Sequence, residues 1–362
     1  MNRPNQPERY FLLVFFSLNM LVSSFSQSII DKSAISIYLE ITDTLSADRD
    51  PSSELWLKMA DHPAYQHIEK AGNRMTYLKT VLPLVYMPSN SEKLKALLEG
   101  KENVHQYMAE HLIEAKKRRK KLEKYLKSED FDYYSDAWLV SLVYLPDDIN
   151  DKLDNLKIYL ALFEDNGFGG RSITVDLLHL YNSGKNQNMD FLAHEFHHTL
   201  RDRSLIHIVY YPEDTLFTPI ISALNKLPLE GVASILDKSK YFQDGYYDYV
   251  KSKFPVHAES VQEFVELVNN VSQNMAAIDS VLMSDLSQKE KANQIFKNLP
   301  WGGHAIGFYM ARAIEQVHGR DKLILAQYDV REFLKLYQIA AEKEDSLYLF
   351  SEESVNYIAS IN

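Results

Sequence analysis

The chain has 362 residues, of which 46% are hydrophobic and 12% aromatic, and its formal net charge is −11 at pH 7. This composition excludes an intrinsically disordered chain, and the length is sufficient for a large hydrophobic core. The acidic balance argues against binding to nucleic acid or to anionic membranes. The sequence contains no Cys, so disulfides cannot stabilise the fold.

Residues 1–26 have the pattern of a signal peptide. Arg3 and Arg9 precede a mostly apolar run at residues 11–22, which is too short to span a membrane. Ser24 and Ser26 lie where a signal peptidase reads small residues, so we predict cleavage before Gln27. A buried N-terminal helix is the alternative. We therefore expect an exported protein, periplasmic or secreted, with no stable membrane insertion after cleavage.

Residues 27–135 are predicted to form a helical N-terminal region. Helical spacing of apolar residues covers 29–45, 51–70 with a break at Pro63, 91–98 and 102–127. The last of these contains a run of six Lys and Arg at residues 116–121. Such runs occur in nucleic-acid-binding segments, but behind a signal peptide we favour a solvated helix face near acidic residues. His105 and His111 are six residues apart, and we expect both at the surface.

The period of the pattern changes between residues 136 and 181. Residues 138–145 and 158–163 are apolar runs that we predict to be strands. Residues 165–170 are rich in turn residues, and residues 172–177 alternate enough for a half-buried strand. The predicted fold class is therefore mainly α with a small β-sheet (α+β).

The strongest signal for chemistry is His194-Glu195-Phe196-His197-His198. On a helix, residues four apart lie on the same face, so His194 and His198 can direct two imidazoles at one point. This arrangement suits a tetrahedral zinc ion, and Glu195 begins beside that point, where a carboxylate can act as a general base. An amphipathic helix with two solvated histidines is the alternative. His197 should face the core or a neighbouring carboxylate rather than the metal, because each helical residue turns about 100° from the last.

A catalytic zinc needs a third protein ligand and an open position. Residues 227–237 are predicted to form a second helix that carries Glu230, thirty-two residues after His198. The small residues Gly231, Ala233 and Ser234 would let this helix approach the first one closely. An ordinary glutamate in a first helical turn is the other interpretation of Glu230.

The rest of the chain is predicted to be helical at residues 256–271, 275–286, 288–299 and 321–362. Residues 301–315 form a further predicted helix with a glycine-rich start at Trp301-Gly-Gly-His304. There is no internal repeat and no low-complexity linker. We assign residues 136–362 to a catalytic region, either separate from residues 27–135 or continuous with them.

His-Glu-x-x-His followed by Glu230-Gly-Val-Ala233 resembles the gluzincin class of zinc metallopeptidases, which includes thermolysin, and in particular the secreted zinc-dependent proteases of bacteria that are known only as predictions. The resemblance covers about residues 167–319. It implies a zincin-like core, one Zn²⁺ ion held by His194, His198 and Glu230, and Glu195 as general base. It also implies a peptide or protein substrate.

The sequence departs from the thermolysin pattern at one position. That pattern has an Asp four residues after the ligand Glu, where it orients a ligand His, and here the position holds Ser234. Asp202 and Asp237 are candidate substitutes. The resemblance further suggests that His304 donates a hydrogen bond to the oxyanion, and that residues 171–176 form an edge strand that pairs with substrate.

The predicted function is that of a secreted zinc metallopeptidase. Two alternatives stay open, namely a metal-binding scaffold with a catalytically silent fold and a zinc hydrolase of non-peptide amides. A structural zinc site would be closed by four protein ligands, and the sequence offers no evident fourth ligand. The oligomeric state is not specified by any feature of the sequence.

Overall fold

The computed structural model describes residues 30–100, 103–128, 131–147, 149, 156–170, 172–204 and 218–361. The predicted signal peptide and the segment at 205–211 lie outside these residues. The chain divides into two compact units, one made of residues 1–136 and 154–185 and the other of residues 137–153 and 186–362. The predicted division into a helical N-terminal region and a catalytic region stays a prediction.

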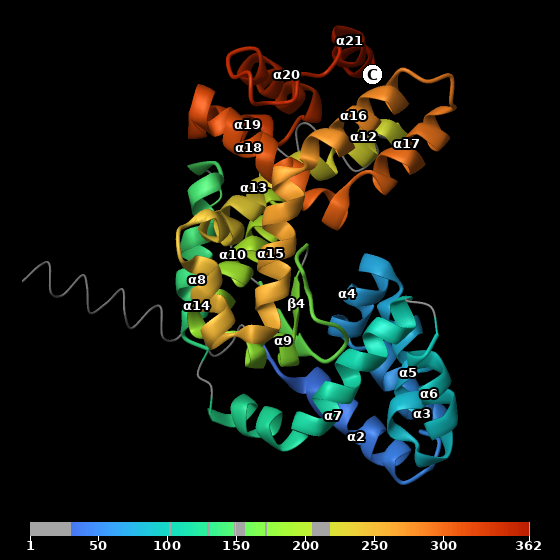
Figure 1. Cartoon of the computed structure of the whole chain (residues 1–362). Coiled ribbons are helices and arrows are strands. Elements are labelled where there is room, and N and C mark those ends of the chain that lie inside the picture. Colours follow the sequence, from blue (N-terminus) through green and yellow to red (C-terminus); the bar gives the residue numbers. More distant parts are fainter. Residues whose placement is uncertain are drawn as a thin grey trace, which may run out of the picture. The chain divides into compact units, whose positions relative to one another are not determined.

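The first unit is built mainly from helices (Figure 1). They are α2 (Ser33–Ser46), α3 (Ser53–Ala60), α4 (Pro63–Gly72), α5 (Arg74–Tyr86), α6 (Ser91–Leu98), α7 (Val104–Ser128) and α9 (Leu177–Asn182), with the 3-10 turn η1 (Pro88–Asn90) between α5 and α6. Local signals set several boundaries. Ser52 caps α3 through the Leu55 N–H, and Pro63 begins α4, where its missing N–H costs no helical hydrogen bond. The helical N-terminal region agrees with the pattern in the sequence.

A four-stranded mixed sheet completes the first unit. Its strands are β1 (Ile30–Asp31), β2 (Ile158–Ala161), β3 (Gly167–Phe168) and β4 (Ile173–Asp176), in the order β1-β2-β4-β3. β1 and β4 run parallel to β2, whereas β3 is antiparallel to β4. The prediction of an edge strand at residues 171–176 is therefore wrong, because β4 is hydrogen-bonded on both sides. Substrate cannot add to β4 without displacing a neighbouring strand.

The expectation that this strand is half buried is also wrong. All four residues of β4 are buried, and its two polar side chains have partners on surrounding helices. Thr174 Oγ1 lies 3.0 Å from His67 Nδ1 of α4, and Asp176 Oδ1 lies 3.0 Å from His111 Nε2 of α7. The alternation of polar and apolar residues thus reflects internal hydrogen bonding rather than contact with water.

His111 is consequently a core residue and not a surface residue, with a side chain only 7% exposed. Asp176 holds more than this one partner, since it also accepts hydrogen bonds from the Phe163 and His179 N–H groups and so caps α9. Burial opposes the charged imidazole, but Asp176 and the nearby Asp165 and Glu164 raise the pKa of His111.

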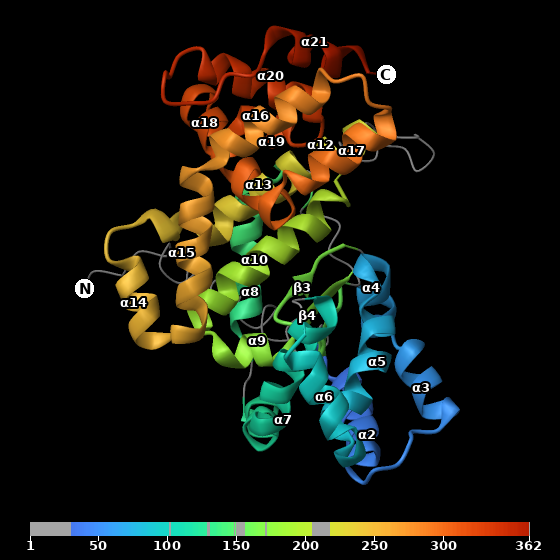
Figure 2. The ribbon, with the colours of Figure 1, turned by 45° about the vertical axis from the view of Figure 1, so that its right-hand side comes forward.

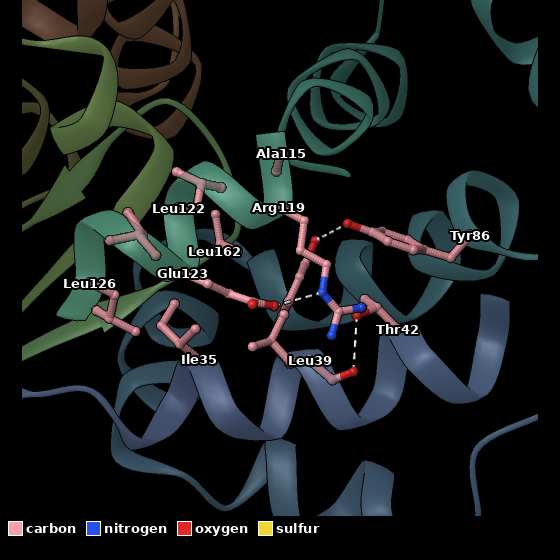
Figure 3. Close-up of a pocket in the computed structure, with 12 residues that line it drawn as sticks. Ile35, Leu39, Thr42, Tyr86, Ala115, Arg119, Leu122, Glu123, Leu126 and Leu162 are labelled. Atoms are coloured by element: carbon pink, nitrogen blue, oxygen red, sulfur yellow. Dashed lines mark hydrogen bonds and ion pairs between the residues drawn. The ribbon is translucent and has the colours of Figure 1, made fainter. Parts of the chain in front are cut away.

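The basic run on α7 behaves as a solvated face with local acidic partners. Arg119 donates to Glu123 and to Asp43 of α2, and Arg118 donates to Glu114. Beneath Arg119, a narrow apolar cavity lies between α2 and α7 (Figure 3). Its tyrosine hydroxyls, on Tyr38 and Tyr86, lie 3.0 Å apart and bond to each other. The polar groups around this cavity satisfy one another, so it is a packing gap rather than a site that awaits a ligand.

The predicted strand at residues 138–145 is wrong. The chain forms α8 (Tyr133–Ser141) and the 3-10 turn η2 (Leu142–Tyr144) there. The buried positions Ala137, Ser141 and Tyr144 recur at helical spacing, while Leu139 is 57% exposed. A continuous apolar run does not distinguish a buried strand from a short helix, and here tertiary packing selected the helix.

In the second unit, the regular secondary structure of the described residues is helical (Figures 1 and 2). Apart from the end of α8, they are α10 (Lys185–Arg201, from its second residue), α12 (Pro219–Leu224), α13 (Lys226–Lys238), α14 (Tyr246–Lys253), α15 (Pro255–Asn269), α16 (Val271–Leu282), α17 (Gln288–Lys297), α18 (His304–His318), α19 (Arg320–Ala326), α20 (Val330–Ala341) and α21 (Glu352–Ser360). The short 3-10 turn η4 (Ser239–Phe242) follows α13, and the 3-10 turn η5 (Pro300–Gly303) precedes α18. One continuous core runs through this unit, with Phe264, Phe308 and Phe333 fully enclosed.

The closest helix contact in the second unit is between α13 and α18, at Gly231 and Gly307. A Cβ built on Gly231 would lie 2.3 Å from the Gly307 carbonyl, and a Cβ on Gly307 would lie 2.2 Å from the Leu227 carbonyl oxygen. No side chain fits between the two backbones. The sequence predicted that Gly231 lets its helix approach α10 closely. This prediction is wrong, because Gly231 packs against Gly307 of α18.

The start of α18 has an unusual backbone. Trp301, Gly302 and Gly303 have φ values of 50°, 65° and 107°, a left-handed run that only glycine adopts without strain. Trp301 is held in this conformation by a hydrogen bond from its indole N–H to Glu263 and by a ring contact with Phe264. The run ends directly before His304, the first residue of α18.

The predicted fold class, mainly α with a small sheet, is confirmed. Among the described residues, no helix is long and apolar enough to cross a membrane.

Candidate metal centre

Helix α10 presents two of the predicted ligands on one face. His194 and His198 are four residues apart, and their Nε2 atoms lie 3.0 Å from each other. Both side chains are largely buried, at 4% and 13% exposure. The helix places the pair because consecutive turns stack residues i and i+4.

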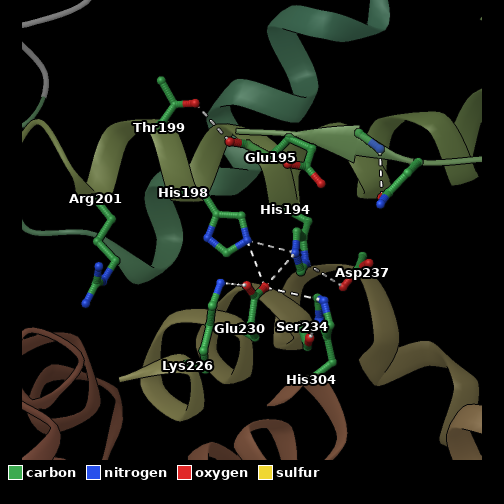
Figure 4. Close-up of polar contacts among 12 residues, drawn as sticks. His194, Glu195, His198, Thr199, Arg201, Lys226, Glu230, Ser234, Asp237 and His304 are labelled. Carbon is green, nitrogen blue, oxygen red and sulfur yellow. Dashed lines mark hydrogen bonds and ion pairs between the residues drawn. The ribbon is translucent and has the colours of Figure 1, made fainter. Parts of the chain in front are cut away.

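Helix α13 supplies the third group. Glu230 Oε2 lies 3.1 Å from His198 Nε2 and 3.6 Å from His194 Nε2 (Figure 4). One ligand atom of each residue lies within 4.8 Å of the others, and within the described part of the chain this is the group of His, Asp and Glu side chains that converges in this way. Ligands about 2.0–2.2 Å from one ion are separated by such distances.

The protonation of the histidines fits a cation between these groups. Asp237 Oδ1 lies 3.2 Å from His194 Nδ1, and a carboxylate accepts only, so Nδ1 carries the hydrogen in neutral His194. The Nε2 lone pair then faces His198 and Glu230. A second nitrogen 3.0 Å away and a carboxylate oxygen are unfavourable neighbours for that lone pair unless a proton or a metal ion lies among them.

Asp237 is itself held in place by Lys238, whose Nζ lies 2.6 Å from Asp237 Oδ2. Although burial raises the pKa of Asp237, Lys238 and His194 hold that pKa below its usual range. Burial also works against the charged form of His194, yet Asp237 raises the pKa of His194 to about 9. Of the two candidate substitutes for the missing Asp, Asp237 contacts His194, a predicted ligand, whereas the exposed side chain of Asp202 pairs with Arg201.

His304 joins the group from α18. Its Nε2 lies 3.4 Å from Glu230 Oε2, and its ring is 5.2 Å from the His194 ring at an interplanar angle of 30°. Ser234 Oγ lies 2.9 Å from the other ring nitrogen, Nδ1. Burial lowers the pKa of His304 to about 3, although the nearby Glu230 carboxylate acts in the opposite direction. His304 is not a member of the converging group, which among the described residues has three members.

Residues 56–346 match the family described as "Putative zinc dependent peptidase (DUF5700)". The chain belongs to this family. It is therefore a member of a family of zinc-dependent peptidases, its cofactor is zinc, and a peptidase acts on peptides or proteins. No curated protein and no solved structure matches the chain.

The matched range includes all the predicted site residues, Glu195 among them. This side chain is 5% exposed and directly follows His194 on α10 (Figure 4). His197 is fully buried, and burial together with His198 and Arg201 lowers its pKa well below the usual value. It points to the core, as its position on the helix predicts, and no carboxylate of the described residues is hydrogen-bonded to its ring.

Three features of the site are not evident in the sequence motifs. Lys238 is the partner of Asp237, Ser234 contacts His304, and Lys226 Nζ lies 3.4 Å from Glu230 Oε1. A partial signal did exist, since Lys226 and Ser234 lie four residues before and after Glu230 and share its helix face. Their partners could not be assigned, because these come from another helix or depend on side-chain conformations.

Proposed function

We propose that this protein is an exported gluzincin-type metallopeptidase in which His194, His198 and Glu230 hold one zinc ion. The observation that carries this proposal is the convergence of three ligand atoms, within 4.8 Å of one another, from two helices. Three protein ligands are typical of catalytic zinc sites, and four of structural sites. The three-membered group therefore favours an enzyme over the alternative of a silent metal-binding scaffold.

We assign each group of the site a separate role in hydrolysis. When bound, zinc supplies Lewis acidity toward the scissile carbonyl and the attacking water. Glu195 accepts the proton of that water as general base and passes it to the leaving amine. His304 donates its Nε2 hydrogen to the carbonyl oxygen as negative charge develops there. Asp237 keeps the Nε2 lone pair of His194 directed at the metal position.

Glu195→Gln is the variant that tests this assignment. Loss of the general base should lower kcat about 10²–10⁴-fold while zinc remains bound, because glutamine keeps the shape but cannot take the proton. Metal content is measured on the purified protein, and hydrolysis with a diverse peptide library. An unchanged rate in the variant would remove Glu195 from the mechanism. If the zinc-loaded wild type cuts no peptide but cleaves small amides or acylated amines, the second alternative replaces the peptidase proposal.

We propose export on the strength of residues 1–26 alone. The test is the N-terminal sequence of protein recovered from outside the cytoplasm of an expressing bacterium, which should begin at Gln27. Recovery of uncleaved chain from the cytoplasm would contradict this part of the proposal and leave the site unaffected.

A further inference from the structure

Ser234 stands four residues after Glu230, where the resembling thermolysin pattern has a carboxylate that orients a ligand histidine. In this structure Asp237, one helical turn further on, makes that contact instead. Ser234 is fully buried on α13, and its Oγ lies 2.9 Å from His304 Nδ1. The residue at this position therefore contacts a different partner, which is a histidine outside the converging group.

The two nitrogens of His304 have distinguishable neighbours. Nε2 lies 3.4 Å from Glu230 Oε2, and that carboxylate has no hydrogen to give. A hydrogen on Nε2 meets an acceptor there, whereas a lone pair on Nε2 would face negative charge. When the ring carries one hydrogen, the favourable form therefore has it on Nε2 and leaves Nδ1 as an acceptor. The Ser234 hydroxyl, which can donate, then completes the arrangement from the other side.

We propose that Ser234 is a positioning residue that holds His304 as the Nε2–H tautomer and thereby keeps it a hydrogen-bond donor rather than a fourth metal ligand. A donor hydrogen on Nε2 cannot coexist with a metal bond to the same nitrogen. The hydroxyl at position 234 thus helps to keep the fourth position of the site open. This inference deepens the proposed function and rests on it for the role of His304 during hydrolysis.

The type of side chain at position 234 determines which ring nitrogen of His304 carries the hydrogen. A carboxylate at this position could only accept, and it would draw the hydrogen onto Nδ1 and turn the Nε2 lone pair toward Glu230 and the ligand histidines. Serine avoids that outcome. Two residues one turn apart on α13 consequently set two histidines in opposite tautomers. Asp237 gives His194 a lone pair for the metal, and Ser234 gives His304 a hydrogen for substrate.

The fold restricts His304 strongly enough for a single hydroxyl to have this influence. The left-handed run at residues 301–303 fixes where α18 begins, and the contact between Gly231 and Gly307 fixes how far α18 lies from α13. The His304 ring is additionally packed against the His194 ring at 5.2 Å. Rotation of the ring is therefore limited, and its state depends on which nitrogen is bonded.

The direct test is ¹⁵N NMR of the zinc-loaded full-length protein labelled at histidine, with the His304 signals assigned by their loss in His304→Gln. The wild type should show a hydrogen on Nε2 and a free Nδ1. A hydrogen on Nδ1 in the wild type overturns the inference. Because this measurement needs no substrate, a wild type that shows the stated tautomer but cuts no peptide would defeat the proposed function and leave the inference standing.

Three variants at position 234 extend the test. Ser234→Ala should weaken the preference for the Nε2 hydrogen, which Glu230 alone then maintains, and lower kcat with KM unchanged, and Ser234→Thr should restore the preference and kcat because it keeps the hydroxyl. The loss on Ser234→Ala should vanish in a His304→Gln background. Ser234→Asp should shift the hydrogen to Nδ1, tighten zinc binding and abolish activity. Thermal unfolding of each variant checks that it is folded, and wild-type kcat in folded Ser234→Ala would refute the positioning role.

Discussion

Both units of this protein bury a histidine against an aspartate, but only one of the two pairs lies in the candidate metal centre. In the first unit, His111 bonds to Asp176, and this carboxylate also accepts hydrogen bonds from two backbone N–H groups. In the second, His194 bonds to Asp237 at 3.2 Å, and the other nitrogen of His194 meets His198 and Glu230. A histidine that an aspartate orients can therefore bind a metal only where other ligand atoms lie close to its second ring nitrogen.

The largest expected effect is a loss of zinc affinity when Glu230, which lies beside His194 of the second pair, is replaced by Ala. This change removes a ligand, so zinc affinity should fall by more than the roughly 10–100-fold typical of losing an outer partner. Competition with a chelator of known affinity measures it. Unchanged affinity would remove Glu230 from the ligand set and leave the site without its third group.

Matched substitutions of the two aspartates would sharpen the comparison. Asp237→Asn should weaken zinc binding by about 10–100-fold, because the amide no longer fixes the Nδ1 hydrogen of His194. Asp176→Asn should leave zinc affinity unchanged but lower the free energy of unfolding by about 3 kcal/mol, because it breaks a buried pair. Chelator competition and urea unfolding are run on both variants. Equal zinc affinities in the two would show that Asp237 acts on stability alone.

The contact between α13 and α18 predicts a structural effect without a change in chemistry. Gly231→Ala places a Cβ 2.3 Å from the Gly307 carbonyl, so the helices must separate, at a cost of about 1–3 kcal/mol. His304 should move away from Glu230 with α18, and activity should fall more than zinc affinity. Gly245→Ala, at an open position whose φ of 77° strains the backbone, is a control for strain away from this contact. Full activity in folded Gly231→Ala would contradict this account of the crossing.

The smallest effect expected is the pH dependence of the pair in the first unit. The pKa of His111 is raised in the folded protein, so its contribution to stability is complete below the ordinary histidine pKa of about 6.5 and is lost as the pH rises through the folded value. The difference in unfolding free energy between wild type and His111→Gln should therefore shrink by about 1 kcal/mol from pH 6 toward alkaline pH. Urea midpoints across this range measure it. A difference independent of pH would mean that His111 is not charged in the fold.

The local part of this protein could be predicted from sequence because it depends on residues near one another in the chain. The spacing of His194 and His198 specified a shared helix face, and Pro63 and the apolar periods located most helices. The family match agrees with the zinc peptidase chemistry inferred from that motif. The roles of His194, Glu195, His198, Glu230 and His304 remain assignments for the experiments above to test.

Tertiary structure alone decided which distant groups meet. The apolar run at 138–145 became a helix, and β4 became an interior strand, because burial on several sides overrode local pattern. His111 looked like a surface residue until Asp176, sixty-five residues away, supplied its partner. Asp237 rather than Asp202 reached His194, and Ser234 reached His304 only because two glycines let α13 and α18 touch. Hydrogen-bond partners are set by distances in space, and a linear pattern does not contain those distances.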